Sequence, residues 1–142
     1  MEVMKNMVSS QHARMMRRIA AVQQKREESD RDNSAVLEET KVYIGLNDSE
    51  TKEQKLETDR YISILKKICQ AYDVPFSFNV VEGGYMHDNG EYTEEKSIVL
   101  TFIDVKQETV DEVAKEACVL FHQESVLITV DQIHARSIRE SL

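Results

Sequence analysis

The alternation of apolar and polar side chains is clearest between Pro75 and Val105, where two strand-like runs flank a polar segment. Asn89 and Gly90 stand near the middle of that segment. An Asn-Gly pair between two alternating runs is typical of a tight hairpin, because both residues tolerate the positive φ that such a turn requires. The pattern therefore predicts a β-hairpin around which the other elements have to pack.

The pairing register of this hairpin follows from its apolar faces. A two-residue turn at Asn89-Gly90 would place Phe78 opposite Thr101, and the apolar faces of the two strands would then not match. One extra residue in the first strand pairs Phe78 with Leu100 instead, which brings the apolar faces together. We therefore expect the second register, with a β-bulge at Gly83-Gly84 and a long tip.

The segments on either side of the hairpin carry strand and helix patterns. Short alternating runs predict a strand over 41–46 and a last strand over 125–130. Thr51 and Thr109 each stand three residues before a Gln or Glu, which is the spacing of a capping box at the start of a helix. Two helices are therefore expected to begin near these threonines, and the first should end at about Tyr72.

The resulting order, βαββαβ, is that of an α+β protein with the ferredoxin-like fold. Right-handed crossovers then give an antiparallel sheet of strand order 4-1-3-2 with two helices on one face. We expect this domain to span residues 40–131 and a tail to follow over 132–142. The other face of the sheet needs a cover, because it should carry an apolar set formed by Tyr43, Val81, Val99, Ile103 and Leu127.

Residues 1–32 predict an amphipathic helix that a polar linker, 33–39, joins to the domain. The apolar seam of this helix has the alternating spacing of four and three that is typical of heptads. An isolated helix of this length is marginal in water, so it needs a surface to cover. Three interpretations remain open: self-association, docking on its own domain, and a basic arm that contacts nucleic acid. The residues expected to mediate self-association are Val8, Met15, Ile19 and Val22.

The net charge of −8 is unevenly distributed along the chain. Residues 1–32 carry seven Lys or Arg against five Asp or Glu, whereas residues 33–142 carry eleven against twenty-one, a balance of −10. An acidic surface repels the nucleic-acid backbone and favours solubility or a basic protein partner. For the domain we therefore expect a protein partner rather than nucleic acid.

The two cysteines and the absence of long apolar runs bear on the compartment. Cys69 and Cys118 both fall within predicted helices, and we interpret them as buried, reduced thiols. The chain has no CxxC or CxxH spacing, no run of membrane-spanning length and no apolar core of a secretory signal near its start. We expect a cytoplasmic protein that contacts no membrane and has no metal or cofactor.

Three loops, 45–51, 83–94 and 122–125, should meet at one end of the predicted fold, because the strands that precede them point the same way. Tyr85 and Tyr92 are candidate aromatic anchors for a partner or a ligand. A general acid–base pair from His122 and Glu124 is an alternative that requires a pocket, and no catalytic residue is assigned. The residues expected to bind a partner or ligand at this end are Tyr85, His87, Asp88, Glu91, Tyr92, Glu94, Glu95, His122, Gln123 and Glu124.

Four short motifs resemble a family of small bacterial proteins of unknown function. They are Tyr43-Ile-Gly45, Gly84-Tyr85, Glu95-Lys-Ser97, and the run from Phe121 to Leu127, FHQESVL. The resemblance spans about residues 40–130 and implies a ferredoxin-like βαββαβ pattern. It also draws attention to Glu95, Ser97, Gln123 and Glu124. Members of the family are expected to be secreted, and this chain departs from them because an Arg- and Met-rich helix stands where the export signal would be.

The sequence favours a non-catalytic, cytoplasmic, self-associating protein-binding module with an acidic surface, expected as a dimer. Small acidic proteins also serve phages and mobile elements as inhibitors of host defence complexes, as anti-CRISPR proteins do, and this analogy adds a narrower hypothesis. The alternative is a small enzyme, or a ligand- or metal-binding sensor, that uses the loop end around His87, His122 and Glu124.

Overall fold

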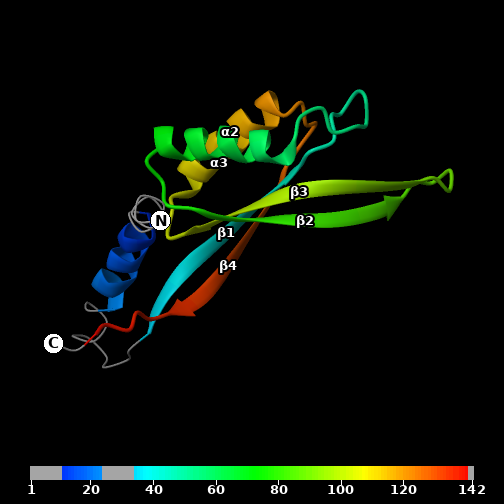
Figure 1. Ribbon diagram of the computed structural model, residues 1–142. Coiled ribbons are helices and arrows are strands. Elements are labelled where there is room, and N and C mark those ends of the chain that lie inside the picture. The colour runs from blue at the N-terminus through cyan, green and yellow to red at the C-terminus, as the bar shows by residue number, and fades with distance from the viewer. Residues whose placement is uncertain (1–10, 24–33, 141–142) are drawn as a thin grey trace.

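The computed structural model of the protein describes residues 11–23 and 34–140 (Figure 1). The described chain forms an N-terminal helix over residues 11–23, followed by four strands and two further helices. The four strands form one antiparallel sheet in the order β2-β3-β1-β4, which is the predicted order read from the other edge. The ferredoxin-like α+β fold is thus confirmed. Its elements are β1 (Ala35–Gly45), α2 (Thr58–Ala71), β2 (Ser77–Met86), β3 (Tyr92–Ile103), α3 (Gln107–Leu120) and β4 (Leu127–Ala135).

Helices α2 and α3 cover one face of the sheet, as Figure 1 shows. Successive strand residues point to opposite faces, so alternate residues of β1 and β3 supply this core. Val42, Ile44 and Leu100 are fully buried there. From the helices, Leu65 and Val113 pack against them as part of the same apolar cluster. The main core therefore lies between the helix pair and the central strands.

The N-terminal helix covers part of the opposite face of the sheet, at the end where β1 begins (Figure 1). Ile19 is 6% exposed and forms a second apolar cluster with Ala35 and Leu37 of β1. The Nη1 atom of Arg18 donates a hydrogen bond of 3.1 Å to the carbonyl of Asp104, which ties the helix to the loop before α3. The helix therefore docks on its own domain, one of the three interpretations left open. Further residues packed against this cluster are Met15, Met16, Val22, Ile103, Ile133 and Ala135.

Self-association through the same helix stays a prediction. Met15, Ile19 and Val22 pack within the chain, and Val8 lies outside the described residues. The rest of the open sheet face is only partly covered: Val99 is buried, whereas Leu127 is 61% exposed. Among the described residues, no helix is long and apolar enough to cross a membrane.

The predicted register of the hairpin is confirmed, but the predicted bulge is wrong. Phe78 pairs with Leu100, and the same register continues without interruption to Met86 and Tyr92. The extra residue that was expected in the bulge lies instead in the turn. There the backbone N–H of Gly90 donates to the carbonyl of His87 at 2.9 Å. Gly90 has φ +87°, so the turn is a three-residue loop that closes with a glycine in the left-handed region.

Both predicted capping boxes are also wrong. Helix α2 begins at Thr58 rather than near Thr51, because the Oδ1 atom of Asp48 accepts the backbone N–H groups of Glu50 and Thr51 at 2.9 and 3.0 Å. This side chain closes a turn of its own, which competes with a helix start at this position. Helix α3 begins at Gln107, two residues before Thr109.

The strands extend further than the alternating pattern indicated. β1 begins at Ala35, so residues 35–39, expected in the linker, belong to the sheet. β4 reaches Ala135 and includes residues expected in the tail. Both extensions are stabilised by pairing with each other, since Leu37 lies opposite Ile133 and Ala35 opposite Ala135.

The cysteines are free thiols in the structure. Cys69 is fully buried in the main core, and this burial raises the pKa of its thiol to about 12. Cys118 is half-buried and donates to the carbonyl of Gln123 at 3.1 Å. Cys69 is therefore a buried packing residue, as the sequence indicated, whereas Cys118 is less buried than expected.

Candidate functional site

Asn47, just after the end of β1, joins the three loops that were expected to meet. Its backbone N–H donates to the Oε2 atom of Glu95 at 2.9 Å, and its side-chain amide donates to the carbonyl of Glu94 at 3.2 Å. Its own carbonyl accepts a hydrogen bond of 2.6 Å from the Nε2 atom of Gln123. The loop after β1 is thus fastened to the hairpin on one side and to the loop after α3 on the other.

The end of helix α3 brings Gln123 to this position. His122 adopts φ +51°, and the N–H of Gln123 donates to the carbonyl of Cys118 at 3.0 Å. This pattern is a Schellman motif, which ends a helix with a residue in the left-handed conformation. The chain therefore turns sharply after Phe121 and directs Gln123 toward Asn47. A further hydrogen bond of 2.9 Å, from the N–H of Ser49 to the carbonyl of His122, holds the two loops together.

The carboxylate of Glu95 lies flat against the backbone of Gly45. A Cβ atom built on Gly45 would lie only 2.7 Å from each oxygen of this carboxylate. The residue opposite Glu95 in β2 is Gly83, which likewise has no side chain. Gly45 therefore leaves room for one half-buried carboxylate at the point where β1 ends. Among the described residues, no Lys, Arg or His lies within ion-pair distance of Glu94 or Glu95.

A cavity of about 470 Å³, here called the three-loop cavity, opens beside Glu95. One face of the hairpin forms its wall: the Nε2 atom of His87 lies 2.7 Å from the Oγ1 atom of Thr93, and the rings of Tyr85 and His87 meet edge to face at 4.8 Å. The loops after β1 and α3 form the rest. The lining residues are Asn47, Asp48, Ser49, Lys52, Tyr85, His87, Asn89, Glu91, Thr93, Glu95, Gln123, Glu124 and Ser125.

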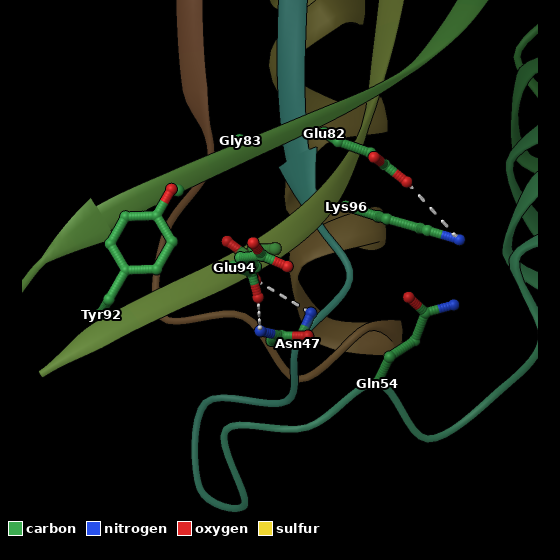
Figure 2. Close-up of a pocket in the computed structure, with 9 residues that line it drawn as sticks. Asn47, Gln54, Glu82, Gly83, Tyr92, Glu94 and Lys96 are labelled. Atoms are coloured by element: carbon green, nitrogen blue, oxygen red, sulfur yellow. Dashed lines mark hydrogen bonds and ion pairs between the residues drawn. The ribbon is translucent and has the colours of Figure 1, made fainter.

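A second cavity of about 480 Å³, here called the hairpin cavity, lies against the other face of the hairpin (Figure 2). Tyr92 reaches across from β3 toward β2, where a Cβ atom on Gly84 would overlap its phenol. Lys96 and Glu82 form an ion pair of 3.9 Å at its other end. Asn47 and Glu95 line both cavities. The remaining lining residues are Gln54, Glu82, Gly83, Gly84, Tyr92, Glu94 and Lys96.

Asp48 holds the shape of the loop after β1. Its side chain is only 4% exposed, and its Oδ2 atom lies 3.2 Å from the Nζ atom of Lys55 and 3.6 Å from the Nδ1 atom of His122. The backbone N–H groups of Thr51 and Glu50 lower the pKa of Asp48 from the usual 3.8 to about 2, and the Lys55 ammonium contributes. This carboxylate is therefore charged at neutral pH, and its contacts are made with groups of the protein itself.

The structure brings most of the sequence-predicted residues to one of the two cavities. His122 faces Asp48 and lines neither cavity, and Asp88 also lies outside both. Six line the three-loop cavity, namely Tyr85, His87, Glu91, Glu95, Gln123 and Glu124, and three line the hairpin cavity, namely Tyr92, Glu94 and Glu95. In the described part of the chain, no group of His, Cys, Asp and Glu side chains is arranged to hold a metal ion.

Asn47 was expected in the converging loops but not among the binding residues, and Lys52 and Thr93 were not among them either. The signal for Asn47 was its place directly after a strand that ends in glycine, where polar side chains often bind. Lys52 and Thr93 carried no comparable signal. Their position depends on contacts between segments that lie far apart in the chain.

No protein-family model and no curated protein sequence matches the chain. Among solved structures, a phage SAM lyase in its apo state is 18% identical, with 78% of this chain and 95% of that chain covered and a TM-score of 0.53. A phage SAM lyase in complex with S-methyl-5′-thioadenosine is 19% identical, with 71% and 90% covered and a TM-score of 0.52. The B. subtilis GlnK–ATP complex is 15% identical, with 69% and 82% covered and a TM-score of 0.46. At these identities the likeness shows the fold alone, and the resemblance to a family of unknown function stays a prediction.

Proposed function

We propose that the protein binds S-adenosylmethionine in the three-loop cavity and cleaves it, releasing S-methyl-5′-thioadenosine. The observation that carries this proposal is the carboxylate of Glu95, which lines the cavity with no cationic partner among the described residues. The fold supports it, because the phage SAM lyases share the chain arrangement over nearly their whole length. This proposal develops the enzyme alternative rather than the non-catalytic one.

The charge of the cavity suits this ligand. S-adenosylmethionine carries a positive sulfonium and a positive ammonium group, and the cavity wall contains Glu91, Glu95 and Glu124 in addition to the internally bound Asp48. Tyr85 adds an aromatic ring, whose face attracts cations. A volume of about 470 Å³ falls within the ~300–1,000 Å³ of small-molecule sites.

The same charges favour release of the product. Formation of S-methyl-5′-thioadenosine breaks the bond between sulfur and the aminobutyryl carbon, and the electron pair of that bond stays on sulfur. The carbon gains a bond in exchange, to an oxygen nucleophile or to its neighbouring carbon with loss of a proton. Sulfur thereby loses its positive charge, and its attraction to Glu95 is lost with it. We therefore expect the product to bind more weakly than the substrate.

The test is titration calorimetry with S-adenosylmethionine, followed by chromatography and mass spectrometry of the mixture. We expect Glu95→Gln to weaken binding by about tenfold or more, since hydrogen bonds and ion pairs to charged groups contribute ~1.5–3 kcal/mol. Glu108→Gln, in the first turn of α3, is the matched control and should leave binding unchanged. The mass of the four-carbon product distinguishes the two bond-forming routes. The absence of both binding and S-methyl-5′-thioadenosine with the full-length protein would contradict the proposal.

A second candidate, protein binding through the hairpin tip, is favoured by one observation. Tyr85, Met86 and Tyr92 are 49%, 65% and 61% exposed at the end of a hairpin that projects beyond the rest of the molecule (Figure 1). Exposed aromatic and methionine side chains of this kind are enriched in interfaces. A basic protein partner, including a component of a host defence complex, is the partner that this candidate implies. It needs no catalysis, so an inactive protein that retains a partner would favour it.

A further inference from the structure

Lys52 stands out in the three-loop cavity because of its charge. Among the described residues that line the cavity, it is the one Lys or Arg, beside the carboxylates of Asp48, Glu91, Glu95 and Glu124. S-adenosylmethionine combines two cationic groups with one anionic group, its α-carboxylate. The cavity thus offers several partners for the cations and a single fixed positive charge for the anion.

We infer that Lys52 binds the α-carboxylate and restricts the site to adenosyl sulfonium ligands that retain it. This inference rests on the proposed function and names the substrate class more narrowly. A ligand without the carboxylate, such as decarboxylated S-adenosylmethionine, would leave the ammonium of Lys52 without its partner.

The loop after β1 places Lys52 by several backbone contacts. Lys52 adopts φ +63°, and its N–H donates to the carbonyl of Asp48 at 2.8 Å. A lysine in the left-handed region is uncommon and persists only where the surrounding structure requires it. The turn that Asp48 closes with the N–H groups of Glu50 and Thr51 supplies that requirement.

The ammonium group of Lys52 has donors to spare. It donates to the carbonyl of Ser49, which accounts for one of its three N–H groups. It forms no ion pair with a described residue, whereas the nearby Lys55 is paired with Asp48 at 3.2 Å. Lys55 is therefore occupied within the loop, and Lys52 is the cation that remains for a ligand.

Two neutral polar side chains of the cavity, His87 and Gln123, already bond within the protein. His87 holds Thr93 through its Nε2 atom, and Gln123 uses its amide N–H₂ group on the carbonyls of Asn47 and Phe121. In the described structure these polar atoms are therefore engaged within the protein. An incoming carboxylate finds its charged partner at Lys52.

The test compares two ligands on two proteins by titration calorimetry: S-adenosylmethionine and its decarboxylated form, on the full-length chain and on Lys52→Gln. We expect the substitution to weaken S-adenosylmethionine binding by about tenfold, at the lower end for a charged hydrogen bond because Lys52 is exposed, and to leave binding of the decarboxylated ligand unchanged. Lys52→Arg should restore most of the discrimination. Lys67→Gln, exposed on α2 away from the cavity, is the matched control.

The outcomes separate the two proposals. Equal weakening of both ligands, or no weakening of S-adenosylmethionine, overturns the role of Lys52 while the proposed function stands. Binding of neither ligand to the unmodified protein overturns both. Thermal unfolding of each variant shows whether it is folded. If Lys52→Gln does not fold, the titrations of Lys52→Arg still test the role of Lys52.

Discussion

The contact between Gly45 and Glu95 permits a stringent test of how the site is built. In Gly45→Ala, the new Cβ atom would lie 2.7 Å from both carboxylate oxygens, so the Glu95 side chain has to rotate away. The carboxylate is the end of a flexible side chain, and moving it disturbs little else. It does, however, break the hydrogen bond of 2.9 Å from the N–H of Asn47.

The expected magnitude combines two opposing effects. Loss of a hydrogen bond to a charged group costs ~1.5–3 kcal/mol of unfolding free energy. Alanine in place of a strand glycine returns ~0.5–1 kcal/mol, because the unfolded chain has fewer conformations to lose. We therefore expect Gly45→Ala to destabilise the protein by about 1–2 kcal/mol, and to weaken S-adenosylmethionine as much as Glu95→Gln does.

A double-mutant cycle in urea isolates the contact. In a Glu95→Ala background no carboxylate stands over residue 45, so Gly45→Ala should stabilise the protein by ~0.5–1 kcal/mol instead. The difference between the two backgrounds, about 1.5–3 kcal/mol, is the coupling between the residues. If Gly45→Ala destabilises both backgrounds equally, the steric account of Gly45 and the placement of Glu95 that depends on it are refuted.

Two further predictions concern the loop and the N-terminal helix. The pKa of Asp48 falls from its usual 3.8 to about 2 in the folded protein, so its stabilisation is complete above about pH 5 and is lost as pH falls through 2. As the pH is lowered across that range, the urea midpoint of unfolding should fall in the parent protein. It should vary less in Asp48→Asn, which keeps an acceptor oxygen but cannot ionise. An equal pH dependence of the two proteins would contradict this. Ile19→Ala should lower the unfolding free energy by ~2 kcal/mol or more without a change in mass by light scattering, because Ile19 is buried against its own sheet. A loss of oligomer mass with unchanged stability would instead favour self-association.

The parts of the fold that sequence predicted correctly are those that a buried face requires. Phe78 and Leu100 had to pair because a shift of one residue would turn the apolar side chains of β2 to solvent. The position of the extra residue was not determined in this way. Both Gly83-Gly84 and Gly90 can adopt unusual backbone conformations, and only the hydrogen bonds of the turn place the extra residue at Gly90.

The candidate site was likewise predicted only in part. Topology was sufficient to predict that the three loops meet, since strand directions determine which loops share an end of the sheet. The side-chain contacts that join them were beyond sequence, because Gln123 and Asn47 are 76 residues apart and their hydrogen bond depends on the exact turn after α3. The false capping box at Thr51 had a related cause: Asp48, three residues earlier, makes a stronger local turn.

The location of Glu95 follows from unequal strand lengths. β1 ends at Gly45, opposite Ser97, whereas β2 and β3 continue to pair as far as Met86 and Tyr92. Beyond this point the sheet has two strands, which no helix of the described residues covers (Figure 1), and a two-stranded ribbon alone is only marginally stable. The bonds of Asn47 to Glu94 and Glu95 brace the ribbon at its base. Glu95 and Asn47 therefore stand at the base of the ribbon, where both line the three-loop cavity and the hairpin cavity.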